Sequence, residues 1–419
     1  MLKDSTDPQE KQKYIVLIVI GLLYSVGIAY TFAVLLPTQR YTDDLYPRLY
    51  ASQQLLAEGR SLYADANAAE LVPIVGWPKA DQLRFYYPAY VLLFTLPLSL
   101  IPYEAARMVW TMAGLWSIWL GTVWVARALK PALSVNQLTL LLVLLTTSVP
   151  ALQHTLNAQF NWLDLLGLTL IILAVRREKY FLAGLAAGLL LFKPQTTLLP
   201  LAFLLIWTAF ERRRWFFWIG LTAASLFLLG LAELFEPGWL VPFLQQLSRY
   251  EPIESVVDSL WNPYQLVSGL LVLAALWFSF KFRRLSAHHY LFNSLLALTI
   301  CLNYVVVPFY GMLHIVLLGL VLVLLVNGFL VQAAPTASAA ATWLWWTANA
   351  LFVIGLLAFG LTIALAGATG LQITIAEMIY KTLLPLLLAL AALLQIFGWP
   401  SGNVVHSSAA AAGRLQASE

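Results

Sequence analysis

Two adjacent carboxylates, Asp43 and Asp44, are the side chains whose type and position most readily suggest chemistry. The chain is 61% hydrophobic and only 11% charged, so two acids directly after an apolar run stand out. Arg40 and Arg48 flank the pair. The pattern is compatible with a general base held at a membrane surface. It is equally compatible with loop charges that cap the next helix or pair with Arg48.

Cations lie at two other boundaries between polar and apolar sequence. Lys193 stands between apolar runs at 180–192 and 195–210, where an ammonium group either snorkels to the interface or binds phosphate. Arg84 begins an aromatic stretch that includes Tyr87. Such a stretch is typical of the aromatic belt of a membrane protein, and the alternative is that Arg84 and Tyr87 contact a ligand.

Amide side chains interrupt the apolar sequence further on. Asn157, Gln159 and Asn161 lie in one short stretch, and amides hydrogen-bond sugar hydroxyls but also form ordinary turns. His314 lies in the apolar run near 309–331 and is either a core histidine or a catalytic one. The chain contains no Gly-rich phosphate loop, no His/Cys metal spacing and no Gly-x-Ser-x-Gly elbow, which argues against nucleotide-driven transport and zinc chemistry.

The composition predicts an all-α, polytopic transmembrane protein. The mean hydropathy is +0.80, and apolar runs of about twenty residues recur to near the C-terminus. Because backbone amides in lipid must be satisfied within each segment, and the runs lack the alternation of outer-membrane strands, the segments should be helices. The net charge of +4 is explained by basic cytoplasmic loops rather than by a nucleic-acid surface.

The apolar runs that must position the candidate side chains number about thirteen, and we expect about 12–13 membrane segments. Several runs are shorter than the ~20 residues that cross a bilayer and should tilt, break or re-enter. The runs lie near 14–36, 85–101, 106–125, 136–153, 160–175, 180–192, 195–210, 215–235, 264–280, 289–306, 309–331, 343–367 and 377–398.

Three basic clusters predict the orientation of these segments. They consist of Arg176, Arg177 and Lys179, of Arg212, Arg213 and Arg214, and of Lys281, Arg283 and Arg284. Even numbers of segments separate the clusters, so the positive-inside rule places all three in the cytoplasm. The segments upstream agree with this orientation if 85–125 crosses the membrane only once, with a re-entrant part near Glu104 and Arg107.

This topology divides the chain into three parts. Residues 1–13 are expected to form a cytoplasmic segment, 14–398 the membrane domain, and 399–419 a disordered tail. Within the domain, 37–84 and 236–263 form two extracytoplasmic loops, of which the first contains most of the candidate residues.

The first loop contains a helical pattern. Leu45, Leu49, Leu55 and Leu56 recur at roughly helical spacing, and Gly59 follows as a stop signal. The pattern predicts a short amphipathic helix on the outer membrane surface, and the alternative is a plain spacer helix.

The order of these sequence motifs along the chain resembles that in glycosyltransferase family 87, whose members have the GT-C fold. The resemblance spans about 14–215, and the C-terminal half is similar only as a string of apolar segments. Each motif is short, so the specificity lies in their order. The matching stretches are Asp44-Leu45-Tyr46-Pro47-Arg48, Leu55-Leu56-Ala57-Glu58-Gly59, Phe85-Tyr86-Tyr87-Pro88, Leu96-Pro97-Leu98, Ala158-Gln159-Phe160-Asn161, Ala183-Gly184 and Lys193-Pro194.

The resemblance implies roles for the candidate residues. Enzymes of this kind have a catalytic Asp in the first extracytoplasmic loop, which by position is Asp44, with Asp43 as the second choice. The sequence has Ala158 where similar chains often have Gly. The expected phosphate-binding cations are Lys193, Arg48 and Arg84. The expected substrate-binding residues are Tyr87, Asn157, Gln159, Asn161 and His314.

The resemblance also implies a reaction. A sugar, such as mannose or another hexose or pentose, would pass from a polyprenyl-phosphate donor to a hydroxyl of a lipid or glycan acceptor by inverting displacement. One carboxylate suffices as base, and no metal cofactor is required, although Asp43 and Asp44 leave a divalent ion open. The active site would lie on the extracytoplasmic side of the cytoplasmic membrane, among membrane lipids and without nucleic acid.

Three other classes of function fit parts of the pattern. A transporter suits many interrupted helices, but no inverted repeat is apparent and intramembrane charge is sparse. An O-antigen ligase or polymerase shares lipid-linked sugar chemistry, yet such enzymes usually have their major outer loop late in the chain. A structural membrane scaffold is the third, because fold alone does not determine function.

Overall fold

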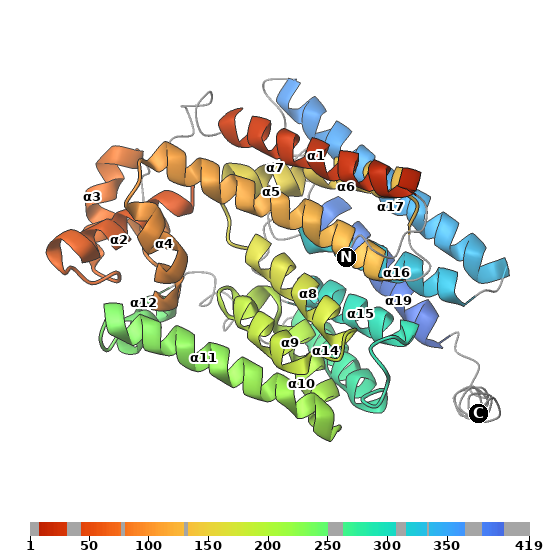
Figure 1. Cartoon of the computed structure of the whole chain (residues 1–419). Helices are drawn as coiled ribbons and strands as arrows, with labels where there is room; N and C mark the ends of the chain where they lie inside the picture. Colours follow the sequence, from red (N-terminus) through yellow and green to blue (C-terminus); the bar gives the residue numbers. More distant parts are fainter. Residues whose placement is uncertain are drawn as a thin grey trace.

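The computed structural model describes residues 8–31, 43–76, 80–129, 133–249, 263–306, 316–332, 335–364 and 379–397. These residues form helices and turns, and no strand occurs among them (Figure 1). The α-helices are α1 (Pro8–Tyr30), α2 (Leu45–Glu58), α3 (Asp65–Val75), α4 (Leu92–Ser99), α5 (Tyr103–Ala128), α6 (Val135–Thr147), α7 (Val149–Leu156), α8 (Trp162–Val175), α9 (Tyr180–Ala187), α10 (Leu198–Ala209), α11 (Phe216–Phe235), α12 (Leu240–Ser248), α14 (Pro263–Lys281), α15 (Tyr290–Val306), α16 (Leu318–Val331), α17 (Pro335–Ala364) and α19 (Leu384–Phe397).

Membrane-spanning helices confirm the predicted class, a polytopic helical membrane protein. Four helices are long and apolar enough to cross a bilayer, namely Gln12–Tyr30, Tyr103–Ala128, Arg212–Phe235 and Ala337–Leu357. The helices α6 and α7 meet at a 50° bend and together could form one broken span. Eight further apolar helices have only 10–17 residues, fewer than the ~20 that cross a bilayer. The described part of the chain therefore contains four or five helices long enough to cross a bilayer alone, together with short apolar helices of the kind that the sequence predicted would tilt, break or re-enter.

The segment 85–125 contains one long helix. The 3₁₀ turn η4 (Ala89–Val91) and α4 form a short apolar piece, whereas α5 has 26 residues and is about 39 Å long. Glu104 and Arg107 lie in the first turns of α5, directly after the short piece, so the expectation of a re-entrant part near them stays a prediction. Pro102, the N-cap of α5, separates the two pieces because proline disfavours helix at the preceding residue.

Close packing between α9 and α11 depends on glycine. A Cβ atom at Gly184 of α9 would lie 2.0 Å from the carbonyl oxygen of Phe217, and one at Gly220 of α11 would lie 2.1 Å from that of Phe181. Only glycine lets the two backbones approach this closely, as in small-residue interfaces of membrane helices. The Gly184 predicted as part of a family motif is therefore a packing residue.

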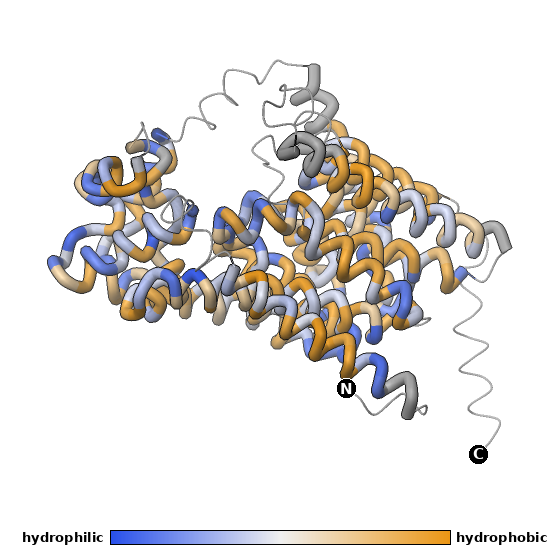
Figure 2. The backbone as a smooth tube through the Cα atoms, turned by 90° about the horizontal axis from the view of Figure 1, so that it is seen from above, coloured by the Kyte–Doolittle hydropathy of each residue, from blue (hydrophilic) through white to orange (hydrophobic). Residues whose placement is uncertain are grey.

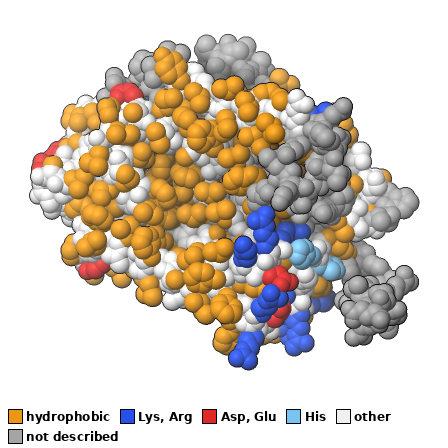
Figure 3. Space-filling model, viewed as in Figure 1, with side chains coloured by type: hydrophobic (Ala, Val, Ile, Leu, Met, Phe, Trp, Pro, Cys, Tyr) orange, Lys and Arg blue, Asp and Glu red, His pale blue; other side chains and the backbone are white. Residues whose placement is uncertain are grey.

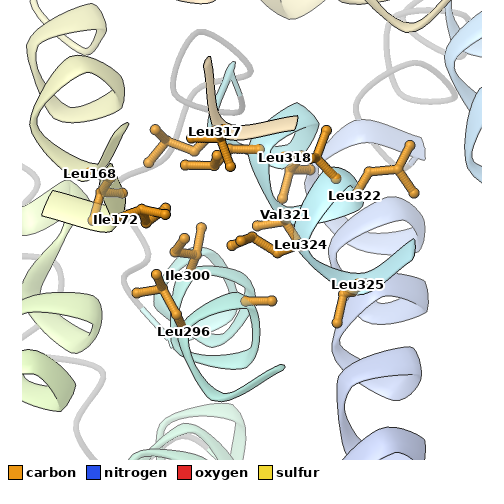
Figure 4. Close-up of a cluster of buried hydrophobic side chains, with 14 of the residues drawn as sticks. Leu168, Ile172, Leu296, Ile300, Leu317, Leu318, Val321, Leu322, Leu324 and Leu325 are labelled. Carbon is orange, nitrogen blue, oxygen red and sulfur yellow. The ribbon is translucent and has the colours of Figure 1, made fainter. Parts of the chain in front are cut away.

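The largest apolar core lies among α8, α15 and α16. Figure 4 shows Leu168 and Ile172 of α8 facing Leu296 and Ile300 of α15, with Leu318 and its neighbours of α16 beside them. These five side chains have no exposed surface. The core therefore orients α8, whose N-terminal end enters the candidate site.

The three predicted basic clusters lie at one end of the molecule, which we call the basic end. Arg214 Nη1 donates to the carbonyl of Arg283 at 3.0 Å, and Arg213 pairs with Glu178 at 2.5 Å. Lysine and arginine side chains gather there in Figure 3, while hydrophobic side chains cover much of the visible surface. The prediction that the clusters share one side is thus confirmed.

The two predicted outer loops meet at the opposite end. The backbone NH of Leu62 donates to Glu236 Oε2 at 3.2 Å, and the rings of Tyr63 and Phe243 are 6.1 Å apart. Helix α11 begins at the basic end and ends at Phe235, so its 20 residues separate the two ends by about 30 Å. The region of α2 to α4 is visibly more hydrophilic than the bundle (Figure 2).

The amphipathic helix predicted in the first loop exists as α2, and Gly59 ends it with φ +62°. Its apolar face is covered by protein in part: Leu45 and Leu49 are buried, whereas Leu56 is 48% exposed. Ser52 of α2 donates to Thr95 of α4 at 2.9 Å. Helix α4 therefore covers part of this face, and the location of α2 on the outer membrane surface stays a prediction.

Candidate functional site

Asp44 lies at the N-terminal end of α2, against the turn that precedes α8. Its backbone NH donates to the carbonyl of Asn157 at 3.0 Å, and Gln159 Nε2 donates to its Oδ2. Arg48 Nη1 lies 4.0 Å from Oδ1, four residues further along the helix. The side chain of Asp44 is 32% exposed. It is therefore a carboxylate that is held in place but still accessible.

Asp43 has a different environment and a structural role. Its carboxylate accepts hydrogen bonds from the backbone NH groups of Leu45 at 3.1 Å and Tyr46 at 2.9 Å, which satisfies amides that a helix start leaves unpaired. It also pairs with Arg107 Nε at 3.0 Å and accepts from the Tyr103 hydroxyl. Burial raises the pKa of Asp43, and Arg107 opposes that shift. The helix-capping interpretation therefore fits Asp43, and Asp44 is the accessible acid.

Lys193 lies behind the Asp44 carboxylate, in the turn between η5 (Gly188–Leu191) and η6 (Pro194–Thr196). Its Nζ donates to Gln159 Oε1 at 2.8 Å and to Asn161 Oδ1 at 3.0 Å. Burial lowers the pKa of Lys193 to about 8, and the negative charges of Asp44 and Asp164 oppose that shift. Four side chains from three parts of the chain are thus joined in one polar cluster.

Arg48 is buried with unsatisfied hydrogen-bond donors. Its side chain is 5% exposed, and its Nε and Nη1 atoms have no hydrogen-bond partner among the described residues. The guanidinium lies over the ring of Tyr87, 5.1 Å from its centroid, and this ring packs on Phe160 at 4.7 Å. Since unpaired buried donors are costly, this geometry indicates a site for an anionic ligand beside Asp44.

The turn at 157–161 places the amides by an unusual backbone conformation. Ala158 has φ +45°, a region that favours glycine, which explains why similar chains often have Gly there. Trp110 Nε1 donates to the Ala158 carbonyl at 2.9 Å and helps to hold the turn. The side chain of Asn157 donates to the carbonyl of Gln153 at 2.8 Å, so it ends α7, as an ordinary turn residue does.

Two predicted site residues are not brought to Asp44 by the described contacts. Arg84 pairs with Asp81 at 3.0 Å and with Asp65 at 3.4 Å, and these carboxylates belong to the surface of the first loop. His314 lies outside the described residues. The structure brings together Asp44, Arg48, Tyr87, Gln159, Asn161 and Lys193.

Three residues beside the cluster were not predicted as part of the site. Arg107 and Tyr103 hold Asp43, and Asp164 of α8 accepts a hydrogen bond from the Thr196 hydroxyl. Arg107 and Asp164 are fully or almost fully buried. The sequence signal that could have identified Arg107 and Asp164 was a charged residue inside an apolar segment. Such a charge is costly in free energy and therefore tends to be functional. Tyr103 gave no comparable signal.

Asp43 and Asp44 are potential metal ligands by residue type. Among the residues that the structure describes, no group of three or more His, Cys, Asp or Glu side chains is close enough to hold a metal ion. The Asp43 carboxylate is already occupied by Arg107 and by backbone NH groups. What the arrangement offers is one accessible proton acceptor next to a buried cation with free donors.

Comparison with known proteins gives one match. Residues 85–326 match the model of a family described as Glycosyltransferase family 87. No curated protein and no solved structure gives a match. The matched segment includes Tyr87, Gln159, Asn161 and Lys193 and begins after Asp44. It extends further into the C-terminal half than the motif resemblance did, and it leaves out the first loop.

Proposed function

The chain belongs to glycosyltransferase family 87, because the family model covers more than half of it, and on this premise we propose how this membrane glycosyltransferase uses its sugar donor and acceptor. The proposed donor is a polyprenyl-phosphate sugar, with mannose or another hexose or pentose as the sugar. The proposed acceptor is a hydroxyl of a lipid or glycan. The polyprenyl chain stays in the bilayer while the phosphate and the sugar occupy the site.

A single observation carries the assignment of a phosphate-linked donor. Arg48 is buried, its Nε and Nη1 have no partner among the described residues, and it lies 4.0 Å from Asp44. A phosphate oxygen would satisfy these donors through charge-assisted hydrogen bonds, which are stronger than neutral ones. Lys193, buried behind Gln159, adds positive charge to the same region. Both cations would stabilise the charge that develops on the leaving phosphate.

The proposed chemistry is one in-line displacement. Asp44 accepts the proton of the acceptor hydroxyl, and the resulting oxygen attacks the anomeric carbon. The bond between that carbon and the phosphate oxygen breaks, the polyprenyl phosphate leaves, and the configuration inverts. A retaining double displacement would need a second carboxylate as nucleophile. Asp43 is unsuited to that role because Arg107 and two backbone amides hold it.

The proposed location of the site is the extracytoplasmic side of the cytoplasmic membrane. The three basic clusters lie at the other end of the molecule from Asp44, and basic loops of membrane proteins are concentrated in the cytoplasm. The two ends are separated by the length of α11, whose start is next to Arg214 and whose end is next to Glu236. A polyprenyl-linked sugar presented at the outer leaflet would therefore reach Asp44 directly.

Donor consumption provides the test of this proposal. The purified protein is incubated with a panel of polyprenyl-phosphate sugars, and mass spectrometry measures loss of the sugar from each lipid. We expect consumption of one donor, and none with Asp44→Asn at equal protein concentration. If no polyprenyl-phosphate sugar is consumed while a nucleotide sugar is, the proposed donor is wrong. Solute flux into proteoliposomes without a glycosidic product would instead favour the transporter hypothesis.

A further inference from the structure

The amide of Gln159 connects the proposed base to Lys193. We infer that Gln159 is a positioning residue, which holds Oδ2 of Asp44 and thereby leaves Oδ1 as the oxygen that takes the acceptor proton. This inference rests on the proposed function, because it assigns a task to each oxygen of the proposed base. It replaces the expectation that Gln159 binds the sugar.

The orientation of the Gln159 amide is determined by Lys193. An ammonium group has only donors, so the amide oxygen must face it, and Gln159 Oε1 lies 2.8 Å from Lys193 Nζ. The amide nitrogen therefore faces the other way, toward Asp44 Oδ2. Rotating the amide by half a turn would put its NH₂ against the ammonium group and its oxygen against the carboxylate, which are two repulsive contacts. The amide can thus serve Asp44 in only one orientation.

The side chain of Gln159 is enclosed by protein and is hydrogen-bonded at both ends of its amide. Its side chain is almost fully buried, as is that of Lys193, and hydrogen bonds are electrostatically stronger in such a region than in water. Both ends of the amide are bonded to protein side chains. Asn161 accepts a second hydrogen bond from Lys193 at 3.0 Å, which prevents the lysine from turning away.

The other oxygen of Asp44, Oδ1, is the one that Gln159 does not bond. Arg48 Nη1 lies 4.0 Å from Oδ1, which is too long for a hydrogen bond. Because the Asp44 side chain is 32% exposed, a hydroxyl group can reach Oδ1. The oxygen that takes the proton and the cation that binds the phosphate would then lie side by side, as an in-line reaction between acceptor and donor requires.

Two substitutions at Gln159 test the inference. In Gln159→Met the side chain keeps its approximate volume but cannot hold Asp44, so we expect kcat to fall by roughly 10²-fold because the base is misplaced. The KM for the donor should stay within about twofold of wild type, as an effect on positioning alone predicts. A rise in KM at unchanged kcat would show that Gln159 binds substrate and would overturn the inference.

Gln159→Glu tests the role of Gln159 through the pH dependence of kcat/KM. The new carboxylate would pair with Lys193 and place a like charge against Asp44, in place of the hydrogen bond that Gln159 donates. The acidic limb of the kcat/KM profile should therefore move to higher pH. An acidic limb at the wild-type position overturns the inference, and this measurement decides the question even if Gln159→Met fails to fold.

Gln53→Met is the matched control. Gln53 lies on α2 and donates to the carbonyl of Ser99 at 2.9 Å, so its loss removes an amide hydrogen bond away from Asp44. We expect wild-type kcat for this variant. Asp44→Asn, assayed alongside, separates the two hypotheses. Activity in Asp44→Asn refutes the proposed base itself, whereas an inactive Asp44→Asn with a fully active Gln159→Met refutes only the role of Gln159.

Discussion

The two ends of the molecule each contain a buried arginine, and the two side chains differ in what they bond. At the basic end, Arg214 donates to the carbonyls of Arg283 at 3.0 Å and Leu285 at 2.9 Å and lies over the ring of Trp207, 4.0 Å from its centroid. At the other end, Arg48 has two donor atoms without a partner among the described residues. The two side chains are equally buried, but among the described residues Arg48 has two donor atoms without a partner, Nε and Nη1, whereas Arg214 has only Nε.

This difference separates structural cations from those available to a ligand. A buried donor that bonds a backbone carbonyl stabilises the fold, whereas one without a partner costs free energy until a ligand satisfies it. The same distinction applies to the neighbouring acids, because Asp43 is held by Arg107 and Tyr103 while Asp44 stays partly exposed. The partners of a buried charge are therefore more informative about its role than its burial is.

The largest expected effect is on the accessible acid. Asp44→Asn removes the proton acceptor, and loss of a general base typically lowers the rate by about 10²–10⁴-fold. Because Asn keeps the size and accepts the Gln159 hydrogen bond, thermal stability should stay close to that of wild type. Initial rates of donor consumption and thermal unfolding measure both effects. A fully active Asp44→Asn would remove the functional contrast between the two acids.

The next largest effect is expected from Arg48. Arg48→Met removes the free donors, and hydrogen bonds to charged groups contribute about 1.5–3 kcal/mol. The KM for the donor should therefore rise about 10- to 100-fold, while the Tm should be unchanged or higher, because an unsatisfied buried cation has been replaced by an apolar side chain. Kinetics over a range of donor concentrations provides the measurement. Wild-type KM together with a lowered Tm would identify Arg48 as structural.

Arg214 should respond in the opposite way. Arg214→Met removes the donor to the carbonyls of Trp207 and Arg283, and each buried acceptor left unsatisfied costs about 1–3 kcal/mol. The Tm should fall, and kcat and donor KM per folded molecule should stay at their wild-type values, because the residue is about one α11 length from Asp44. Size-exclusion chromatography followed by the donor assay separates folding from activity. An altered donor KM would indicate that the two ends are coupled.

The smallest expected effect concerns pH and Lys193. Its pKa is lowered by burial to about 8, against the opposing charges of Asp44 and Asp164, so the ammonium form is complete well below pH 8 and is lost above it. As the pH rises from 7 to 9, kcat/KM should therefore fall, since the deprotonated amine no longer stabilises the phosphate or fixes the Gln159 amide.

The corresponding control is Lys193→Met, which has no group at position 193 that titrates in this range. Its remaining activity should be low and should not show the decline between pH 7 and pH 9. If the variant shows the same alkaline decline as wild type, another group is responsible, and Lys193 has no titrating role in the reaction.

Much of the fold followed from local patterns. An apolar helix occurs in each predicted segment that the structure describes, and Gly59 ends α2 where expected. Among the described helices, four or five are long enough to cross a bilayer alone, and hydropathy by itself does not decide whether a shorter apolar helix is buried in protein or lies in lipid. In α2, likewise, Leu45 and Leu49 are buried in protein while Leu56 is 48% exposed, a division that the hydrophobic spacing did not indicate.

The candidate site could be predicted only in part. Its residue types were recognisable because carboxylates and cations are rare in this chain, and the order of the motifs indicated the family. The bond between Gln159 and Asp44 joins residues 115 positions apart, and the bond between Lys193 and Gln159 joins residues 34 positions apart. Such partners depend on how α2, α8 and α10 pack, which no local pattern specifies.

The sequence by itself determined that this protein is a helical membrane protein of a glycosyltransferase family with an acidic pair in its first loop. Only the tertiary structure decided which acid is accessible. Asp43 and Asp44 are adjacent at the start of a helix, where successive side chains point about 100° apart, so one faces Arg107 of α5 and the other faces Gln159. Composition and spacing determine which groups are present, whereas their partners follow from the packing of distant segments.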